Sequence, residues 1–253
     1  MITNIQKRIL YSLVPAFLLT LLMWFLAVLQ WGMDWNLTHG GILPRSLRGI
    51  AGILSSPLIH GDFRHILTNT PPFLFLGWCL YYFYKEIANR VFIIIWLLTG
   101  VFTWLLGREA WHIGASGLIY ALAFFLFFSG VFRHNTRLSA VTLIVVFLYG
   151  GLIWNMIPLA GMADPLISWE GHLSGALAGL IVSVIFRKEG PQSDPIADLT
   201  EEEANDENPY WEIKKEEPAS AENAETGSPH KTSGPTSTQA LRSGTKEEKS
   251  DSK

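Results

Sequence analysis

Long apolar stretches alternate with short polar gaps along residues 1–188. A hydrocarbon core about 30 Å thick needs about 20 apolar residues when the chain crosses it as a helix. Six stretches have about this length: residues 9–31, 63–84, 91–106, 113–132, 138–157 and 166–186. Charged residues lie almost entirely in the gaps. Six such stretches in series argue against buried helices of a soluble domain. The pattern therefore predicts an all-α polytopic membrane protein with six spans, of which 91–106 is the shortest.

The composition changes abruptly after residue 188. Residues 1–188 hold 12 basic and six acidic side chains, whereas residues 189–253 hold seven basic and 16 acidic ones, a net charge of −9. The second segment has few apolar residues to bury, so we expect a disordered acidic tail. Its charge would keep it away from anionic lipid and free for a cytosolic partner.

Basic residues in the short loops predict the orientation of the bundle. With a cytoplasmic N-terminus, eight lysines and arginines flank the inner ends of the spans and four flank the outer ends. Both termini are therefore expected inside. The first apolar stretch follows Lys7 and Arg8 but is too long for the core of a signal peptide, so we expect an uncleaved span. No targeting presequence is apparent, so we expect a multi-pass protein of a prokaryotic plasma membrane.

Polar residues at membrane depth are the candidates for function, because they are costly in lipid. His65 and Asn69 lie four residues apart and share a helix face at the start of the second stretch. His172 lies early in the sixth stretch, on the same stripe as Gly175 and Gly179, a spacing that lets helices approach closely. Ser116 lies at the start of the fourth. The predicted orientation places all of these at the outer level, although each alone is also compatible with simple packing.

A serine, a histidine and other hydrogen-bonding groups at one level fit nucleophilic acyl transfer. Ser116 would be the nucleophile and His172 the base that accepts its proton. His65, Asn69 and the backbone N–H of Ser116 are candidate donors to the oxyanion. Tyr120 follows Ser116 by one turn and is placed to pack on the imidazole. No aspartate is placed to orient His172, so we predict a dyad rather than a triad.

Gly114 and Gly117 flank the serine, although glycine costs roughly 1 kcal/mol against alanine in an exposed helix. We expect them to let the fourth span approach the sixth and to leave room for a substrate backbone. Glu170 lies two residues before His172 and so faces another direction, which predicts a charge at the membrane interface.

Three motifs together resemble the rhomboid family of intramembrane serine proteases. They are Gly114-Ala115-Ser116-Gly117 with Tyr120, then His60, His65 and Asn69, and finally His172, Gly175 and Gly179. The resemblance covers roughly residues 9–187. It implies a six-helix rhomboid-like core whose Ser116–His172 dyad opens to the non-cytoplasmic side, with His65 and Asn69 in the oxyanion site.

The resemblance also implies the partners. Substrates would be membrane-anchored proteins cut at or near their transmembrane helix, within the lipid bilayer. No metal, no organic cofactor and no nucleic acid are expected.

Two features depart from the family pattern. The first outer loop lacks an adjacent tryptophan and arginine, since Arg45 and Arg48 have no neighbouring Trp. Pro71 and Pro72 follow Asn69 closely, so the oxyanion groups are expected on a short, bent first section of the second span.

Two other functions remain open at this point. A rhomboid-like protein without catalysis would bind transmembrane clients, although it would have no need of both Ser116 and His172. A small transporter would line its path with His65, Asn69 and His172. Against the transporter, these polar groups cluster at one depth instead of forming a series across the bilayer.

Overall fold

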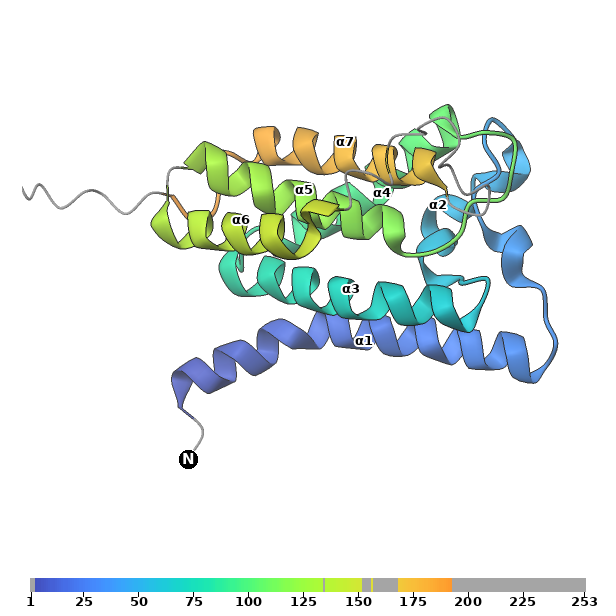
Figure 1. Cartoon of the computed structure of the whole chain (residues 1–253), viewed down its shortest axis with the longest axis horizontal. Coiled ribbons are helices and arrows are strands. Elements are labelled where there is room, and N and C mark those ends of the chain that lie inside the picture. Colours follow the sequence, from blue (N-terminus) through green and yellow to red (C-terminus); the bar gives the residue numbers. More distant parts are fainter. Residues whose placement is uncertain (1–2, 134, 152–155, 157–167, 193–253) are drawn as a thin grey trace, which may run out of the picture. The chain divides into compact units, whose positions relative to one another are not determined.

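The computed structural model describes residues 3–133, 135–151, 156 and 168–192. All the longer elements in this part are helices, and they run side by side in one bundle (Figure 1). They are α1 (Asn4–Gly32), α2 (Gly52–Ser55), α3 (Phe63–Phe83), α4 (Ala88–Leu106), α5 (Ser116–Arg133), α6 (Thr136–Tyr149) and α7 (Trp169–Ile185). The predicted acidic tail lies outside the described residues from 193 onward, as does the end of the fifth predicted span.

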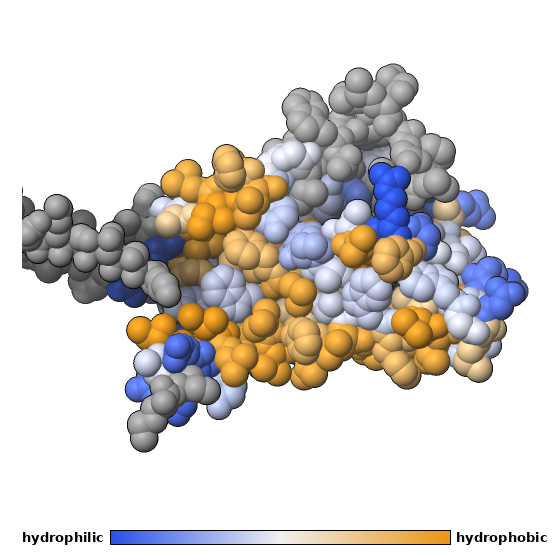
Figure 2. Space-filling model, turned by 60° about the horizontal axis from the view of Figure 1, so that its bottom comes forward, coloured by the Kyte–Doolittle hydropathy of each residue, from blue (hydrophilic) through white to orange (hydrophobic). Residues whose placement is uncertain are grey.

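The helices match the apolar stretches of the sequence. The prediction of an all-α protein with apolar helices is confirmed for the described residues. Within the described part, α1, α4 and α5 are long and apolar enough to cross a membrane, while α6 and α7 are shorter apolar helices. Figure 2 shows apolar side chains covering much of the face on which α1 lies, with hydrophilic residues toward the ends. The count of six spans stays a prediction.

One stripe of α1 packs against α3. The helix begins with a capping box, in which Thr3 and Gln6 each bond the other's backbone N–H. Its buried residues recur every three or four positions: Ser12, Ala16, Thr20, Met23, Ala27 and Gln30. Small side chains dominate this stripe, and Ala16 lies where a side chain at Gly77 would be. The remaining faces of α1 expose large apolar residues, as contact with lipid requires.

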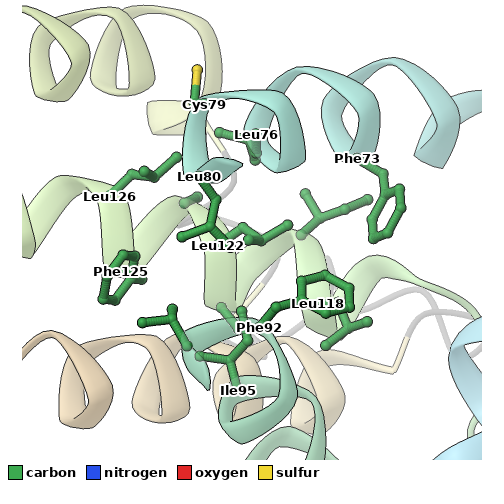
Figure 3. Close-up of a cluster of buried hydrophobic side chains, with 14 of the residues drawn as sticks. Phe73, Leu76, Cys79, Leu80, Phe92, Ile95, Leu118, Leu122, Phe125 and Leu126 are labelled. Atoms are coloured by element: carbon green, nitrogen blue, oxygen red, sulfur yellow. The ribbon is translucent and has the colours of Figure 1, made fainter. Parts of the chain in front are cut away.

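Helix α5 is the centre of the bundle. It packs against α7, α6, α3 and α4, and 61% of its most apolar stretch is buried, against 22% in α1. Figure 3 shows the core that surrounds it, where most of the labelled side chains of α3, α4 and α5 point toward one another, while Cys79 points away from them. The labelled residues are Phe73, Leu76, Cys79, Leu80, Phe92, Ile95, Leu118, Leu122, Phe125 and Leu126. A nucleophile on the first residue of α5 is therefore attached to the best-packed helix.

The contact between α5 and α7 depends on two glycines. A Cβ at Gly175 would collide with the carbonyl oxygen of Gly117, and a Cβ at Gly179 would collide with that of Ala121. The backbones of the two helices thus touch directly over two turns, as the spacing of small residues in α7 predicts.

The two prolines do not divide α3 into separate sections. Pro71 and Pro72 lie inside one continuous helix from Phe63 to Phe83. In the turn before the prolines, the Thr70 hydroxyl donates to the carbonyl of Ile66 and accepts from the indole N–H of Trp24, which ties this turn of α3 to α1. The oxyanion candidates therefore belong to the same helix as the rest of the span.

The loop between α1 and α3 packs on the end of α4. It contains three 3₁₀ helices, Leu37–Gly40, Leu47–Gly49 and Ser56–Leu58, in addition to α2. The indoles of Trp96 and Trp104 donate to the loop carbonyls of Ile53 and Ser46. The Arg45 guanidinium donates to the carbonyls of Leu105 and Gly107, a favourable place for a cation at a helix C-terminus. The loop is thus anchored by tryptophans of α4 rather than by an adjacent Trp–Arg pair.

Buried Arg133 joins the C-terminal end of α5 to the C-terminal end of α7. Its guanidinium donates to the carbonyls of Phe186, Glu189 and Pro191, and its Nε bonds the Ser129 hydroxyl. Lys and Arg gather at this end, including Arg90, which pairs with Glu189 at 2.7 Å. Ser116 and His172 lie at the other end of the same helices.

The packing of α7 on α5 predicts the effect of one methyl group. Gly179→Ala should destabilise the protein by about 1–3 kcal/mol, because the new Cβ has no space against the backbone of α5. Gly32→Ala is the matched control, since nothing lies within 4 Å of the added carbon. Thermal unfolding in detergent measures both changes. Equal melting temperatures for the two variants would contradict the close contact.

Candidate active site

Ser116 is the first residue of α5, and the segment before it is fixed by two backbone hydrogen bonds. The N–H of Gly114 donates to the carbonyl of Ser56 at 2.8 Å, and the N–H of Ala115 donates to Nε2 of His60 at 3.4 Å. Both partners belong to the loop before α3. The first N–H groups of a helix have no partner within it, so the backbone around Ser116 presents donors to the site.

Gly114 is required for two independent reasons. Its φ of +104° is in the left-handed region, which residues with a side chain rarely adopt. A Cβ at this position would also lie 2.5 Å from the imidazole of His65. The ring of His65 therefore rests directly on the glycine two residues before the candidate nucleophile.

Gly117 serves a different contact. A Cβ there would lie 2.9 Å from the Thr99 methyl group and 3.2 Å from the carbonyl oxygen of Gly171. This glycine lets α5 approach α4 and α7, as predicted. The expectation for Gly114 needs correction, because its space is taken by His65 of α3 rather than by α7.

His172 faces Ser116 across the contact between α5 and α7. Its Nε2 lies 3.0 Å from the Ser116 Oγ, within hydrogen-bond distance. The phenol ring of Tyr120 stacks on the imidazole, with 4.3 Å between ring centroids and 10° between planes. His172 is buried and Ser116 half-buried. A hydroxyl paired with an imidazole nitrogen in this way is poised to transfer its proton when it attacks a carbonyl.

The start of α7 fixes the backbone that carries this imidazole. Ser168 is the N-cap, and its hydroxyl oxygen accepts from the N–H of Gly171 at 3.1 Å. The carbonyl of Ser168 also accepts from the N–H of His172 at 3.2 Å.

Asn69 is one turn along α3 from His65 and is buried. Its side-chain amide nitrogen has no hydrogen-bond partner among the described residues. A buried donor without a partner is costly, and such a group is often explained by a function. Together with the His65 ring on Gly114, it places two donor-bearing side chains on the helix that packs beside the start of α5.

Sequence reasoning gave His60 no role beyond the motif, although the structure places it against the nucleophile segment. The side chain is 1% exposed, and its ring centroid lies 5.0 Å from that of His65. Burial, reinforced by the neighbouring His65, lowers the pKa of His60 to about 4. The ring is thus neutral near pH 7, as its role as acceptor from Ala115 requires. The sequence could not predict this contact, because a loop has no periodicity that shows which residues its side chains meet.

Glu170 is buried in the first turn of α7. Its side chain is 4% exposed and pairs with the Arg108 guanidinium at 3.5 Å. Arg108 follows α4, so this ion pair connects the end of that helix to the first turn of α7.

A small cavity of about 30 Å³ is lined in part by Ser116. Its lining includes Thr99 and Thr103 of α4, His112, and Ser168. The volume suits one or two water molecules rather than a substrate side chain. Among the described residues, no three His, Cys, Asp or Glu side chains gather as a metal site requires.

Comparison with known proteins identifies the family of this chain. The family model described as the Rhomboid domain matches residues 48–189, a range that contains Ser116, His172, His65 and Asn69. The chain belongs to the rhomboid family. The family's general activity is intramembrane serine proteolysis, and the apolar helices agree with a membrane protein.

The curated relatives add no function of their own. Proteins of Mycobacterium tuberculosis (strain H37Rv) and Mycobacterium bovis, both named as uncharacterised, are 36% identical over 157 residues. The aligned region is 60% of this chain and 65% of theirs, so the rhomboid chain spans under two thirds of these relatives. A protein of Mycobacterium leprae, named likewise, is 30% identical over 157 residues, 62% of its length.

The neutral state of His60 predicts a specific loss of stability in acid. Because unfolding restores its ordinary pKa of 6.5, the unfolded chain binds a proton between pH 6.5 and about 4 that the folded chain does not. Stability therefore falls as the pH drops through this window, by about 3 kcal/mol from this group. His60→Gln keeps an acceptor for Ala115 without the titration and should lose less stability.

Thermal unfolding at pH 7 and pH 4.5 measures this difference. His39→Gln controls for the loss of a histidine from the same loop, where His39 contacts Trp111. An identical acid-induced loss in the wild type and in His60→Gln would show that His60 is not held neutral by the fold.

Proposed function

We propose that this rhomboid is an intramembrane serine endopeptidase that cuts membrane-anchored proteins at or near their transmembrane helix. The observation that carries the proposal is the 3.0 Å separation of Ser116 Oγ and His172 Nε2, between residues 56 positions apart in the sequence. The stacked Tyr120 supports it, because it restricts the imidazole to an orientation that faces the serine.

The reaction follows from these two groups. Ser116 Oγ attacks the scissile carbonyl carbon while His172 Nε2 takes the hydroxyl proton, so a C–O bond forms and the carbonyl electrons move to oxygen. Collapse of this tetrahedral intermediate expels the amine, which receives the proton from His172. Water then attacks the acyl-enzyme with His172 again as base, and Ser116 is regenerated with a free carboxyl product.

The oxyanion needs donors that are in place before the reaction. We assign this role to the Asn69 amide, the His65 imidazole and the backbone N–H of Ser116. The support is the unpartnered amide nitrogen of Asn69 and the contact of His65 with Gly114. A substrate carbonyl would give the Asn69 donor the partner that it lacks.

The substrate class follows from the membrane setting. A peptide bond within a helix is inaccessible, so the substrate helix must unwind locally, and helix-weakening residues near the cleavage point should favour cutting. We place the protein in a plasma membrane as a six-span, multi-pass core, residues 1–188, with both termini cytoplasmic. Residues 189–253 would form the acidic tail, available to a cytosolic partner. No metal or organic cofactor enters the proposed mechanism.

The dyad predicts the result of reconstitution in liposomes with a generic transmembrane reporter. The wild type should cleave the reporter, while Ser116→Ala and His172→Ala should lose cleavage because nucleophile or base is gone. Ser139→Ala, an exposed serine of α6, is the matched control and should cleave normally. Cleavage by Ser116→Ala would refute this nucleophile. No cleavage by folded wild type would favour a client-binding protein.

Removal of one oxyanion donor should lower the rate without loss of the fold. Asn69→Ala is expected to reduce kcat by about 10²-fold, the usual range for one donor in serine hydrolases. Leu67→Ala, an exposed position on the same helix, should leave kcat unchanged. Initial rates over a range of reporter concentrations separate kcat from KM. A normal kcat for Asn69→Ala would exclude Asn69 from the oxyanion site.

A further inference from the structure

We propose that His112 is a positioning residue that fixes the start of α7 and, through it, the place of the His172 imidazole opposite Ser116. The inference rests on the proposed function for its catalytic meaning. His112 lies in the segment between α4 and α5, and its side chain reaches the N-cap of α7.

The hydrogen bonds of His112 have one consistent arrangement. Nε2 lies 3.0 Å from the carbonyl oxygen of Arg108, which only accepts, so Nε2 carries the proton. Nδ1 is then an acceptor and takes the hydroxyl proton of Ser168, whose Oγ lies 2.6 Å away. Burial lowers the pKa of His112 and outweighs the bond to the Arg108 carbonyl and the nearby Glu170 charge, which raise it, and this agrees with the neutral tautomer.

The bond to His112 orients the Ser168 hydroxyl for its capping role. With its proton directed at Nδ1, the oxygen presents a lone pair to the N–H of Gly171. The carbonyl of the same serine accepts from the N–H of His172. Ser168 thus holds two consecutive amides of α7, and the second belongs to the proposed base.

The backbone of His112 holds the nucleophile side. Its N–H donates to the carbonyl of Ile42 at 2.8 Å, and its carbonyl accepts from the N–H of Ile42 at 2.9 Å. The chain continues from this bridge over four residues to Ser116. One residue therefore links the segment that carries the serine to the cap of the helix that carries the histidine.

An ion pair also connects the segment after α4 to α7. Arg108, whose carbonyl accepts from His112, pairs through its guanidinium with buried Glu170. The end of α4 is thus joined to the first turn of α7 through a charge pair and through the His112–Ser168 bond. A rigid support of this kind matters because an error of about 1 Å in the reacting geometry can cost 10²-fold in rate.

Kinetic measurements with the full chain in liposomes test the role. His112→Phe fills the space without hydrogen bonds and should lower kcat by roughly tenfold or more while KM stays within about twofold. His112→Asn keeps an acceptor for Ser168 and should recover part of kcat. His39→Phe, the same change in a loop histidine that contacts Trp111, should leave both constants unchanged.

A double-mutant cycle separates this link from general damage. Ser168→Ala removes the cap itself and should lower kcat as His112→Phe does, and the double variant should be no worse than the more impaired single one. Ser46→Ala, which removes the N-cap of a 3₁₀ helix in the outer loop, is the matched control. Independent losses that multiply in the double variant would overturn the proposal.

Hydrogen exchange of the segment Ser168–Gly175, read by mass spectrometry, gives a result that needs no activity. His112→Phe should speed exchange at the start of α7 and leave the exchange of α3 unchanged. If the wild type proves inactive but this acceleration is seen, the proposed protease function fails and the anchoring role of His112 stands. If the wild type is active and His112→Phe changes neither kcat nor exchange, the positioning role fails alone.

Discussion

The direct backbone contact between α5 and α7 is the constraint on which the site depends. Ser116 Oγ and His172 Nε2 lie 3.0 Å apart across this contact. Gly175 and Gly179 remove the side chains of α7 where it meets the backbone of α5, and Gly117 does the same on α5. In lipid, helix association is not driven by the burial of apolar surface away from water. Close packing of this kind is therefore itself a main source of stability. The same interface therefore stabilises the bundle and brings serine to histidine.

The end of this interface that carries Ser116 and His172 needs additional support, because helix ends fray and polar groups there compete with water. The loop before α3 supplies it for α5, where Ser56 and His60 bind the two amides that precede Ser116. The segment after α4 supplies it for α7, through Arg108 and His112. The irregular parts of the chain thus fix the ends of the two helices that carry Ser116 and His172, while the contact between the helices brings these residues together.

The sequence was sufficient for features that follow helical periodicity. It predicted that Ser116 and His172 share one level, that Tyr120 packs on the imidazole one turn later, and that small residues of α7 face α5; the structure agrees in each case. It did not predict that α3 continues as one helix through Pro71 and Pro72. It also missed the contacts of His60 and His112, because loop geometry has no period from which to read them.

Three buried histidines at this end of the rhomboid differ in function because their partners differ. His60 accepts from a backbone amide, and its low pKa makes it a fixed acceptor near neutral pH. His112 is committed at both nitrogens, to a carbonyl that can only accept and to a capping hydroxyl. His172 instead meets a half-buried serine hydroxyl that no helix cap requires. Under the proposed function, this difference in partners gives His60 and His112 structural contacts and gives His172 the role of base.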